Sequence, residues 1–222
     1  MPTVEPLEVT LDREACAPAR VQGFDIGPNG ELPGAVVFLG DIDSGKAWPE
    51  LADSDRIIDQ QGCRYLPRFM AVPVGTVVQF RNSDPIPHNV RVESGFEIVL
   101  NVAQPHIGGL DSLVADKEGP LTVACDYHPW MFASIFVVPT PYYAVADSNG
   151  VFTITDIPPG TYNVLAWYPD PIARRLADDA GKLVRYAYGP PYTSSREVLV
   201  KSREETPAPI ELTWRGTGGS RP

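Results

Sequence analysis

The sequence has few of the residues that bind soft metals, with only three cysteines, three histidines and three methionines among 222 residues. It contains no apolar run near the roughly eighteen residues that a membrane-spanning helix needs, so we expect no transmembrane segment. The start of the chain, Met1 to Pro6, has neither the basic region nor the apolar core of a signal peptide. Either the chain is cytoplasmic, or its numbering begins at a processed form.

Basic residues are also scarce. Lysine and arginine number 18 against 28 aspartates and glutamates, which gives a net charge of −10. Residues 1–140 hold 19 acidic and 9 basic side chains, whereas residues 141–222 hold 9 of each. This balance argues against binding to nucleic acid, whose partners are basic. It favours steering of a basic protein partner toward the first part of the chain, although the acidity could also serve only solubility.

Helical periodicity is scarce too, while 24 prolines and 19 glycines indicate many turns. Short runs rich in β-branched and aromatic residues recur between turn residues, which predicts an all-β sandwich. The runs in the first part are 35–39, 76–80, 89–92, 121–125 and 134–138. Helical segments are expected only near 48–55 and 171–179.

A domain boundary is predicted near Pro139 and Pro141, because two prolines there separate two sets of β-rich runs. The later runs are 142–146, 151–154, 161–167, 197–200 and 210–214. They predict a second, smaller β-sandwich. We therefore expect a first domain over 1–140, a second over 141–215 and a flexible tail over 216–222.

Four candidate metal ligands stand in a narrow pattern. Cys125, His128 and Met131 lie within the run Cys-Asp-Tyr-His-Pro-Trp-Met, and His88 lies 37 positions before Cys125. One thiolate, two imidazoles and one thioether argue against magnesium, calcium and manganese. Two histidines and a cysteine with a long axial methionine form the arrangement of a type 1, or blue, copper centre. The pattern therefore predicts one copper ion.

The ligands are expected at one end of the sandwich. A strand ending at Cys125, a short turn and a returning strand from Ser134 place three of them together, and His88 begins another strand. Pro87 and Pro129, beside the two histidines, stiffen their turns. Four protein donors leave no open position for a substrate, so electron transfer is expected rather than an enzyme reaction.

The stretch from Asn82 to Val90, together with the Cys-Asp-Tyr-His-Pro-Trp-Met run, resembles the cupredoxins. The ligand loop is most similar to that of amicyanin, which also has two residues between cysteine and histidine and two between histidine and methionine. The resemblance implies an eight-stranded Greek-key sandwich with a type 1 copper. It also implies that His128 is the more exposed ligand, through which electrons leave, and that Asn89 supports the site by hydrogen bonding near the thiolate.

The stretches 147–152 and 158–162 are similar to carboxypeptidase regulatory-like, or transthyretin-like, domains. A cupredoxin followed by such a domain resembles bacterial plastocyanin-like and methylamine-utilisation proteins. The resemblance implies a periplasmic or other extracytoplasmic location and a redox protein partner, such as a cytochrome or a membrane redox complex. The second domain has no histidine or cysteine, so it is expected to be a scaffold.

Two further groups of residues have open interpretations. Cys16 and Cys63 are either two buried thiols or a disulfide, which an oxidising compartment favours. An apolar patch around His128 is either ordinary loop packing or a docking face for a redox partner. Its residues are Ile86, Pro87, Pro129 and Trp130. His106 has no partner at metal-ligand spacing and is expected to be a loop histidine.

Two other functions remain open from the sequence. The protein could store or deliver copper, although so few methionines and cysteines are unusual for a metal chaperone. Alternatively, the second domain could dock the chain into a larger assembly, with or without an electron-transfer role for the copper site.

Overall fold

The computed structural model describes residues 4–16, 20–21, 24, 26–42 and 45–214. It is almost entirely β, as the sequence predicts, and its one helical element in those ranges is the short 3-10 helix η1 (Asp53–Arg56). No helix in the described part of the chain is long and apolar enough to cross a membrane. The predicted flexible tail, 216–222, lies outside the described residues.

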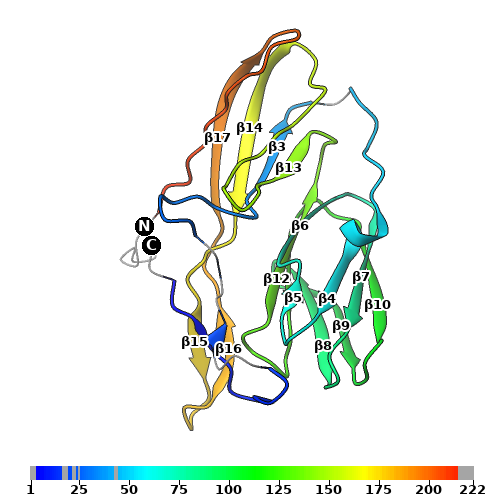
Figure 1. Cartoon of the computed structure of the whole chain (residues 1–222), viewed down its shortest axis with the longest axis vertical. Helices are drawn as coiled ribbons and strands as arrows, with labels where there is room; N and C mark the ends of the chain where they lie inside the picture. The colour runs from blue at the N-terminus through cyan, green and yellow to red at the C-terminus, as the bar shows by residue number, and fades with distance from the viewer. Residues whose placement is uncertain (1–3, 17–19, 22–23, 25, 43–44, 215–222) are drawn as a thin grey trace.

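Two sheets pack face to face to form what we call the first sandwich (Figure 1). Their strand orders are β10-β7-β4-β5 and β6-β12-β11-β8-β9, which is nine strands where the resemblance implies eight. The strands are β4 (Ile57–Gln60), β5 (Tyr65–Leu66), β6 (Phe69–Pro73), β7 (Thr76–Asn82), β8 (His88–Ser94), β9 (Glu97–Gln104), β10 (Leu110–Ala115), β11 (Gly119–Ala124) and β12 (Phe132–Val138).

The side-chain pattern of these strands explains the sandwich. In β7, Val78 and Phe80 are completely buried while Val77 and Arg81 are exposed, which is the alternation of a strand with one face on a core. All seven residues of β12 are buried, because this strand is covered on both faces. One face contributes Ile135 to the core of the sandwich, and the other lies against a second part of the chain.

That second part, which we call the second unit, is built on one sheet of order β13-β3-β14-β17. Its strands are β3 (Val36–Gly40), β13 (Tyr143–Val145), β14 (Gly160–Tyr168) and β17 (Tyr192–Val200). Strand β3 lies within the predicted first domain, 1–140, but pairs with β13 and β14 on its two sides. Pairing over more than a hundred residues leaves no local signal in the sequence, which is why the boundary near Pro139 missed it.

The opposite layer of the second unit is irregular. The core of the sheet is packed by Phe152, Ile154, Ile210 and Leu212, but the segments that carry them do not form strands. The strands expected at 151–154 and 210–214 are therefore absent, although apolar side chains of both segments pack into the core of the second unit. A transthyretin-like fold for this unit remains a prediction.

The two units share an aromatic interface. Phe136 of β12 and Trp167 of β14 have ring centroids 5.0 Å apart, and Val36 and Val138 belong to the same buried cluster. A second cluster joins Phe24 and Phe132 with Tyr168. These contacts hold the second unit against the β6–β12 edge of the first sandwich.

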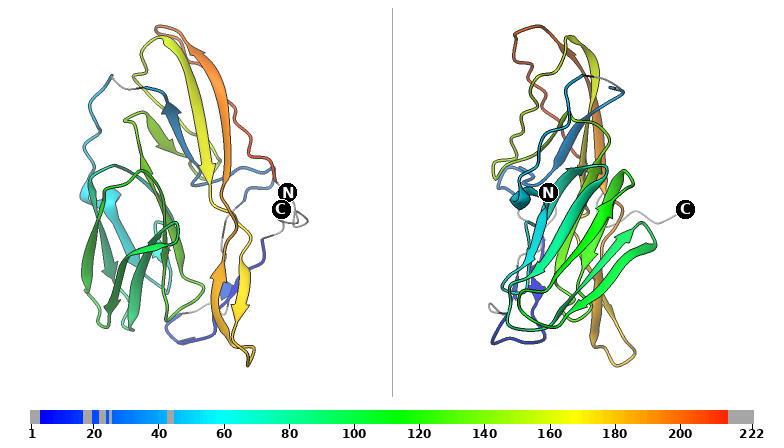
Figure 2. Two further views of the ribbon diagram at one scale, coloured as in Figure 1. Left: turned by 180° about the vertical axis from the view of Figure 1, so that it is seen from behind. Right: turned by 90° about the vertical axis from the view of Figure 1, so that its right-hand side faces the viewer.

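A hairpin extends from the second unit toward the other end of the first sandwich (Figures 1 and 2). It consists of β15 (Arg174–Ala177) and β16 (Leu183–Ala187) and lies near the small sheet of β1 (Leu7–Glu8) and β2 (Arg20–Val21). The helix expected near 171–179 is thus wrong. Tyr186 of β16 packs against the core of the first sandwich, and its hydroxyl accepts the Glu8 N–H at 3.3 Å.

Candidate metal centre

Three of the four predicted ligands meet at one end of the first sandwich. Strand β11 ends just before Cys125, and β8, which begins at His88, pairs with it in antiparallel register. The Cys125 sulfur lies 4.0 Å from His88 Nδ1 and 3.8 Å from His128 Nδ1, and the two Nδ1 atoms are 2.8 Å apart. All three side chains are buried. The strand ladder therefore places a thiol and two imidazoles around one point.

The hydrogen bonds of the two rings show why this point suits a cation. His88 Nε2 lies 2.9 Å from a carboxylate oxygen of Asp84, and His128 Nε2 lies 3.0 Å from one of Asp12. A carboxylate accepts hydrogen bonds, so each ring carries its proton on Nε2. In these tautomers neither Nδ1 carries a hydrogen, and both Nδ1 lone pairs face each other and the Cys125 sulfur. A bound metal cation satisfies all three donors, and nitrogen with sulfur suits copper.

Burial also sets the protonation states of these ligands. It lowers the pKa of His88, although the hydrogen bond that His88 donates to Asp84 acts in the opposite direction. The neutral imidazole, which is the form that binds metal, is thereby favoured. Burial raises the pKa of the Cys125 thiol, while the hydrogen bond from the Asn89 N–H acts in the opposite direction. Metal binding at this thiol would release its proton.

Asn89 ties the two ligand-bearing loops together. Its backbone N–H lies 3.5 Å from the Cys125 sulfur, and its side-chain oxygen accepts the Asp126 N–H. Its amide nitrogen donates to Asn101 Oδ1 at 2.7 Å. Tyr65, which the sequence did not single out, adds a further link, because its buried hydroxyl lies 2.7 Å from Asn89 O and 3.1 Å from Ala124 O.

Met131 closes the ligand turn. Its backbone N–H donates to His128 O at 2.9 Å, and its side chain is buried within the core of the first sandwich. Its role as an axial copper ligand remains a prediction.

Asp84 is a buried carboxylate that the sequence did not identify as part of the site. The N–H groups of Gly62 and Cys63 donate to its two oxygens at 2.7 and 2.8 Å. Both of these residues have positive φ, 59° and 55°, so that successive N–H groups converge on the anion. The Asp84 carboxylate also accepts the hydrogen bond of His88 Nε2. Its position four residues before His88 was the only signal in the sequence.

Residues 4–16, which we call the N-terminal strap, cover the other histidine. Asp12, at φ 46°, points its carboxylate to His128 Nε2. The prediction that His128 is the more exposed ligand is wrong, since both His88 and His128 are 0% exposed. Asp12 lies 116 residues from His128, so no local pattern could reveal the contact.

The expected docking patch is not a continuous surface. Trp130 is 2% exposed, its indole N–H donates to Cys63 O at 3.2 Å, and its ring lies 5.1 Å from that of His128. Ile86 and Pro129 are half-buried, and Pro87 is exposed. Trp130 therefore belongs to the packing under the strap, and its assignment to a docking face is wrong.

A disulfide joins Cys16, at the end of the strap, to Cys63, with the two Cα atoms 5.2 Å apart. Cys63, Asp84 and His88 form a second group of close potential ligands. Because the Cys63 sulfur is bonded to Cys16, it provides no thiolate, so this group is not a second metal site. His106, the third histidine, is exposed.

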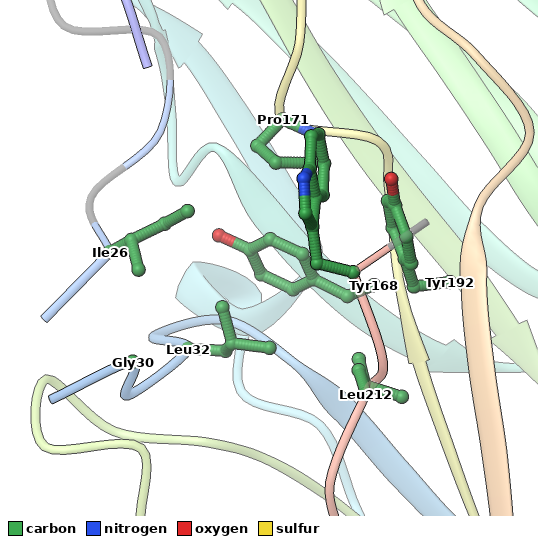
Figure 3. Close-up of a pocket in the computed structure, with 8 residues that line it drawn as sticks. Ile26, Gly30, Leu32, Tyr168, Pro171, Tyr192 and Leu212 are labelled. Carbon is green, nitrogen blue, oxygen red and sulfur yellow. The ribbon is translucent and has the colours of Figure 1, made fainter. Parts of the chain in front are cut away.

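A cleft of about 510 Å³ approaches the centre from the side of its sulfur residues. Cys125 and Met131 line it from the first sandwich, and Arg185, Tyr186 and Tyr188 line it from the second unit. A smaller pocket of about 140 Å³ lies elsewhere (Figure 3), lined mainly by apolar and aromatic side chains. Tyr168, Tyr192 and Trp214 surround it, without any of the predicted ligands.

No protein-family model and no curated protein matches this chain. Among solved structures, it is similar to the reduced state of an amicyanin mutant, with 24% identity and a TM-score of 0.36 over 46% of this chain and 98% of that one. It is also similar to a purple cupredoxin from Nitrosopumilus maritimus, with 26% identity and a TM-score of 0.32 over 37% of this chain and 96% of that one. A copper-containing nitrite reductase from Thermus scotoductus has 22% identity and a TM-score of 0.34, over 46% of this chain and 25% of that one. Since these TM-scores are low, the function must be inferred from the geometry of the site itself.

Proposed function

We propose that this protein binds one type 1 copper and carries single electrons between redox partners. The supporting observation is the buried meeting point of His88 Nδ1, His128 Nδ1 and Cys125 Sγ, three potential donor atoms that lie within 4.0 Å of one another. Met131 is the proposed axial ligand. Copper held by such a set supplies a one-electron couple.

The surrounding residues suit electron transfer better than turnover of a substrate. His88 and His128 have no exposed surface, and Cys125 is 3% exposed. The strand ladder and Asn89 hold these side chains in one geometry, which keeps the rearrangement that accompanies a change of charge small. Because all four proposed donors come from the protein, no position is left for a substrate. We therefore infer a carrier and not an enzyme.

The partner is proposed to approach away from His128, which the strap covers. Asp126 and Tyr127, between two of the ligands, are both exposed. The cleft beside Cys125 and Met131 offers another approach. The acidic excess of the first part of the chain favours a basic redox protein, such as a cytochrome or a membrane redox complex. The disulfide supports an extracytoplasmic, oxidising location such as the periplasm.

Copper loading with a spectroscopic readout tests the proposal. The Cu(II) form of the full chain should show an intense visible thiolate-to-copper band and the narrow EPR splitting of a type 1 site. Cys125→Ser should remove the band, and His88→Ala or His128→Ala should weaken or shift it. His106→Ala is the matched control and should leave the spectrum unchanged. Colourless Cu(II) binding by the wild-type chain would refute a type 1 site.

Copper storage or delivery is less well supported, because the proposed ligands are buried. A competing Cu(I) chelator separates the two functions. An electron carrier should retain its copper during many turnovers with a soluble electron donor. Rapid loss to the chelator would favour delivery instead. A docking role for the second unit is compatible with either result.

A further inference from the structure

We propose that Asp84 and Asp12 are positioning residues that lower the reduction potential of the centre, each by holding the remote nitrogen of one histidine ligand. This inference rests on the proposed copper site. The carboxylate oxygens lie 2.9 Å from His88 Nε2 and 3.0 Å from His128 Nε2. Both rings are therefore fixed with Nδ1 directed at the metal position, and each has a carboxylate behind it.

The charge of these carboxylates acts on the two oxidation states unequally. Loss of one electron makes the centre more positive, and a nearby negative charge stabilises that oxidised state more than the reduced state. Asp84 is 6% exposed, so solvent screens its charge weakly. The Asp12 side chain is 52% exposed, so its effect should be smaller. The direction is the same for both: a lower reduction potential.

The disulfide places both carboxylates. The Cys63 N–H donates to Asp84 Oδ2 at 2.8 Å, and the Cys16 N–H donates to Asp12 O at 2.8 Å. Because Cys16 and Cys63 are bonded to each other, one cross-link holds the strap over His128 and shapes the turn behind His88. The two carboxylates thus belong to one clamp around the pair of imidazoles.

Asparagine substitutions separate charge from structure. Asp84→Asn and Asp12→Asn keep an oxygen that accepts the Nε2–H but remove the negative charge. In Asp84→Asn the amide NH2 also replaces the oxygen that accepts the Gly62 N–H, so Asp12→Asn is the cleaner test of charge. If the carboxylates only satisfy buried N–H groups, the potential should not change. If they tune the centre, it should rise in both variants.

The measurement is the reduction potential of the copper-loaded full chain by redox titration at fixed pH and ionic strength. Asp84→Asn should shift the oxidised-to-reduced ratio at a set potential by about tenfold or more, which is 59 mV for a one-electron couple. Asp12→Asn should give a smaller rise. Glu14→Gln on the same strap and Asp59→Asn on β4 remove one charge without touching either ring, and should change the potential less than either test variant.

A retained visible band with an unchanged potential in both asparagine variants would overturn the inference but not the copper site. Absence of the band in the wild-type chain would instead overturn the proposed function. If Asp84→Asn does not fold, the reduction potentials of Asp12→Asn and of the double variant Cys16→Ser/Cys63→Ser test the inference. The disulfide variant keeps every charge but frees the strap, so its potential should move in the same direction as that of Asp12→Asn.

A second readout needs no redox chemistry. In the zinc-loaded protein, proton NMR should show two imidazole N–H signals that exchange slowly with water. Asp12→Ala should speed exchange at His128 and leave His88 protected. Fast exchange of both signals in the wild-type protein would show that the carboxylate contacts are not maintained, and would overturn the inference.

Discussion

The first sandwich and the second unit close their cores in different ways. In the first, two hydrogen-bonded sheets face each other, and the ligands stand at the ends of β8 and β11 and in the turn before β12. In the second, a single sheet is covered by extended segments without strand pairing. Hydrogen bonding between paired strands fixes the relative positions of their side chains. The first sandwich can therefore keep the predicted metal ligands in a constant arrangement. The second unit contributes cover and support.

Truncation of the chain is expected to have the largest effect among the tests of this comparison. A chain that ends at Thr140 should not form a stable protein, because β3 would lose β14 and β13, its partners on both sides. The apolar face with Phe136 and Val138 would also be exposed. Circular dichroism and size-exclusion chromatography should show aggregation or a lost melting transition. A soluble, cooperatively melting 1–140 chain with a type 1 copper spectrum would show that the first sandwich is independent.

Core substitutions compare the two interiors more finely. Ile135→Ala removes a fully buried side chain between paired sheets, and it should lower the free energy of unfolding by about 2–5 kcal/mol. Leu39→Ala in the second unit should cost less within that range, because an irregular layer can relax into the cavity. Urea denaturation measures both. A larger loss for Leu39→Ala would contradict the view that the second core is the more adaptable.

A smaller effect is expected at Tyr65, which bridges two ligand-bearing segments. Tyr65→Phe removes the hydroxyl beside Asn89 O and Ala124 O and leaves buried carbonyls with fewer partners. The free energy of unfolding should fall by about 1–3 kcal/mol. Tyr127→Phe, at an exposed position, is the matched control and should change it by no more than about 0.5 kcal/mol. Equal effects of the two substitutions would show that the Tyr65 hydroxyl does not stabilise the ligand-bearing segments.

The sequence predicted those parts of the fold that depend on local pattern. Strands β7, β8, β11 and β12 follow from runs of β-branched and aromatic residues bounded by turn residues, and their ends place His88 and Cys125 together. The residues 171–179 were misread as helical, because a proline followed by Ala-Arg-Arg-Leu-Ala favours a helix locally. The turn from Asp178 to Gly181 instead joins β15 to β16. The hairpin contacts the strap through the hydrogen bond between the Glu8 N–H and the Tyr186 hydroxyl.

What the sequence could not predict depends on contacts between distant residues. The pairing of β3 with β14 and the contact of Asp12 with His128 each join segments more than a hundred positions apart. The exposure of His128 was inferred from the resemblance to cupredoxins, and the strap reverses it. The spacing in the sequence therefore predicted the group of His88, Cys125 and His128 that the structure brings together, whereas the strap over His128 and the two carboxylates, Asp84 and Asp12, required the three-dimensional structure.

The smallest predicted effect lies at the turn that leads from β13 into the irregular layer of the second unit. The Asp147 carboxylate accepts the N–H groups of Val151 and Asn149 at 2.9 and 2.8 Å, and these bonds lower the pKa of Asp147. A lowered folded-state pKa means that the carboxylate stabilises the fold above its unfolded pKa of about 3.9, and that this contribution is lost as the pH falls through the folded value. The stability difference between wild type and Asp147→Asn should therefore be present at neutral pH and shrink below about pH 4. Urea titrations across that interval measure it. A difference that grows on acidification would mean that this turn does not anchor the second layer through its charge.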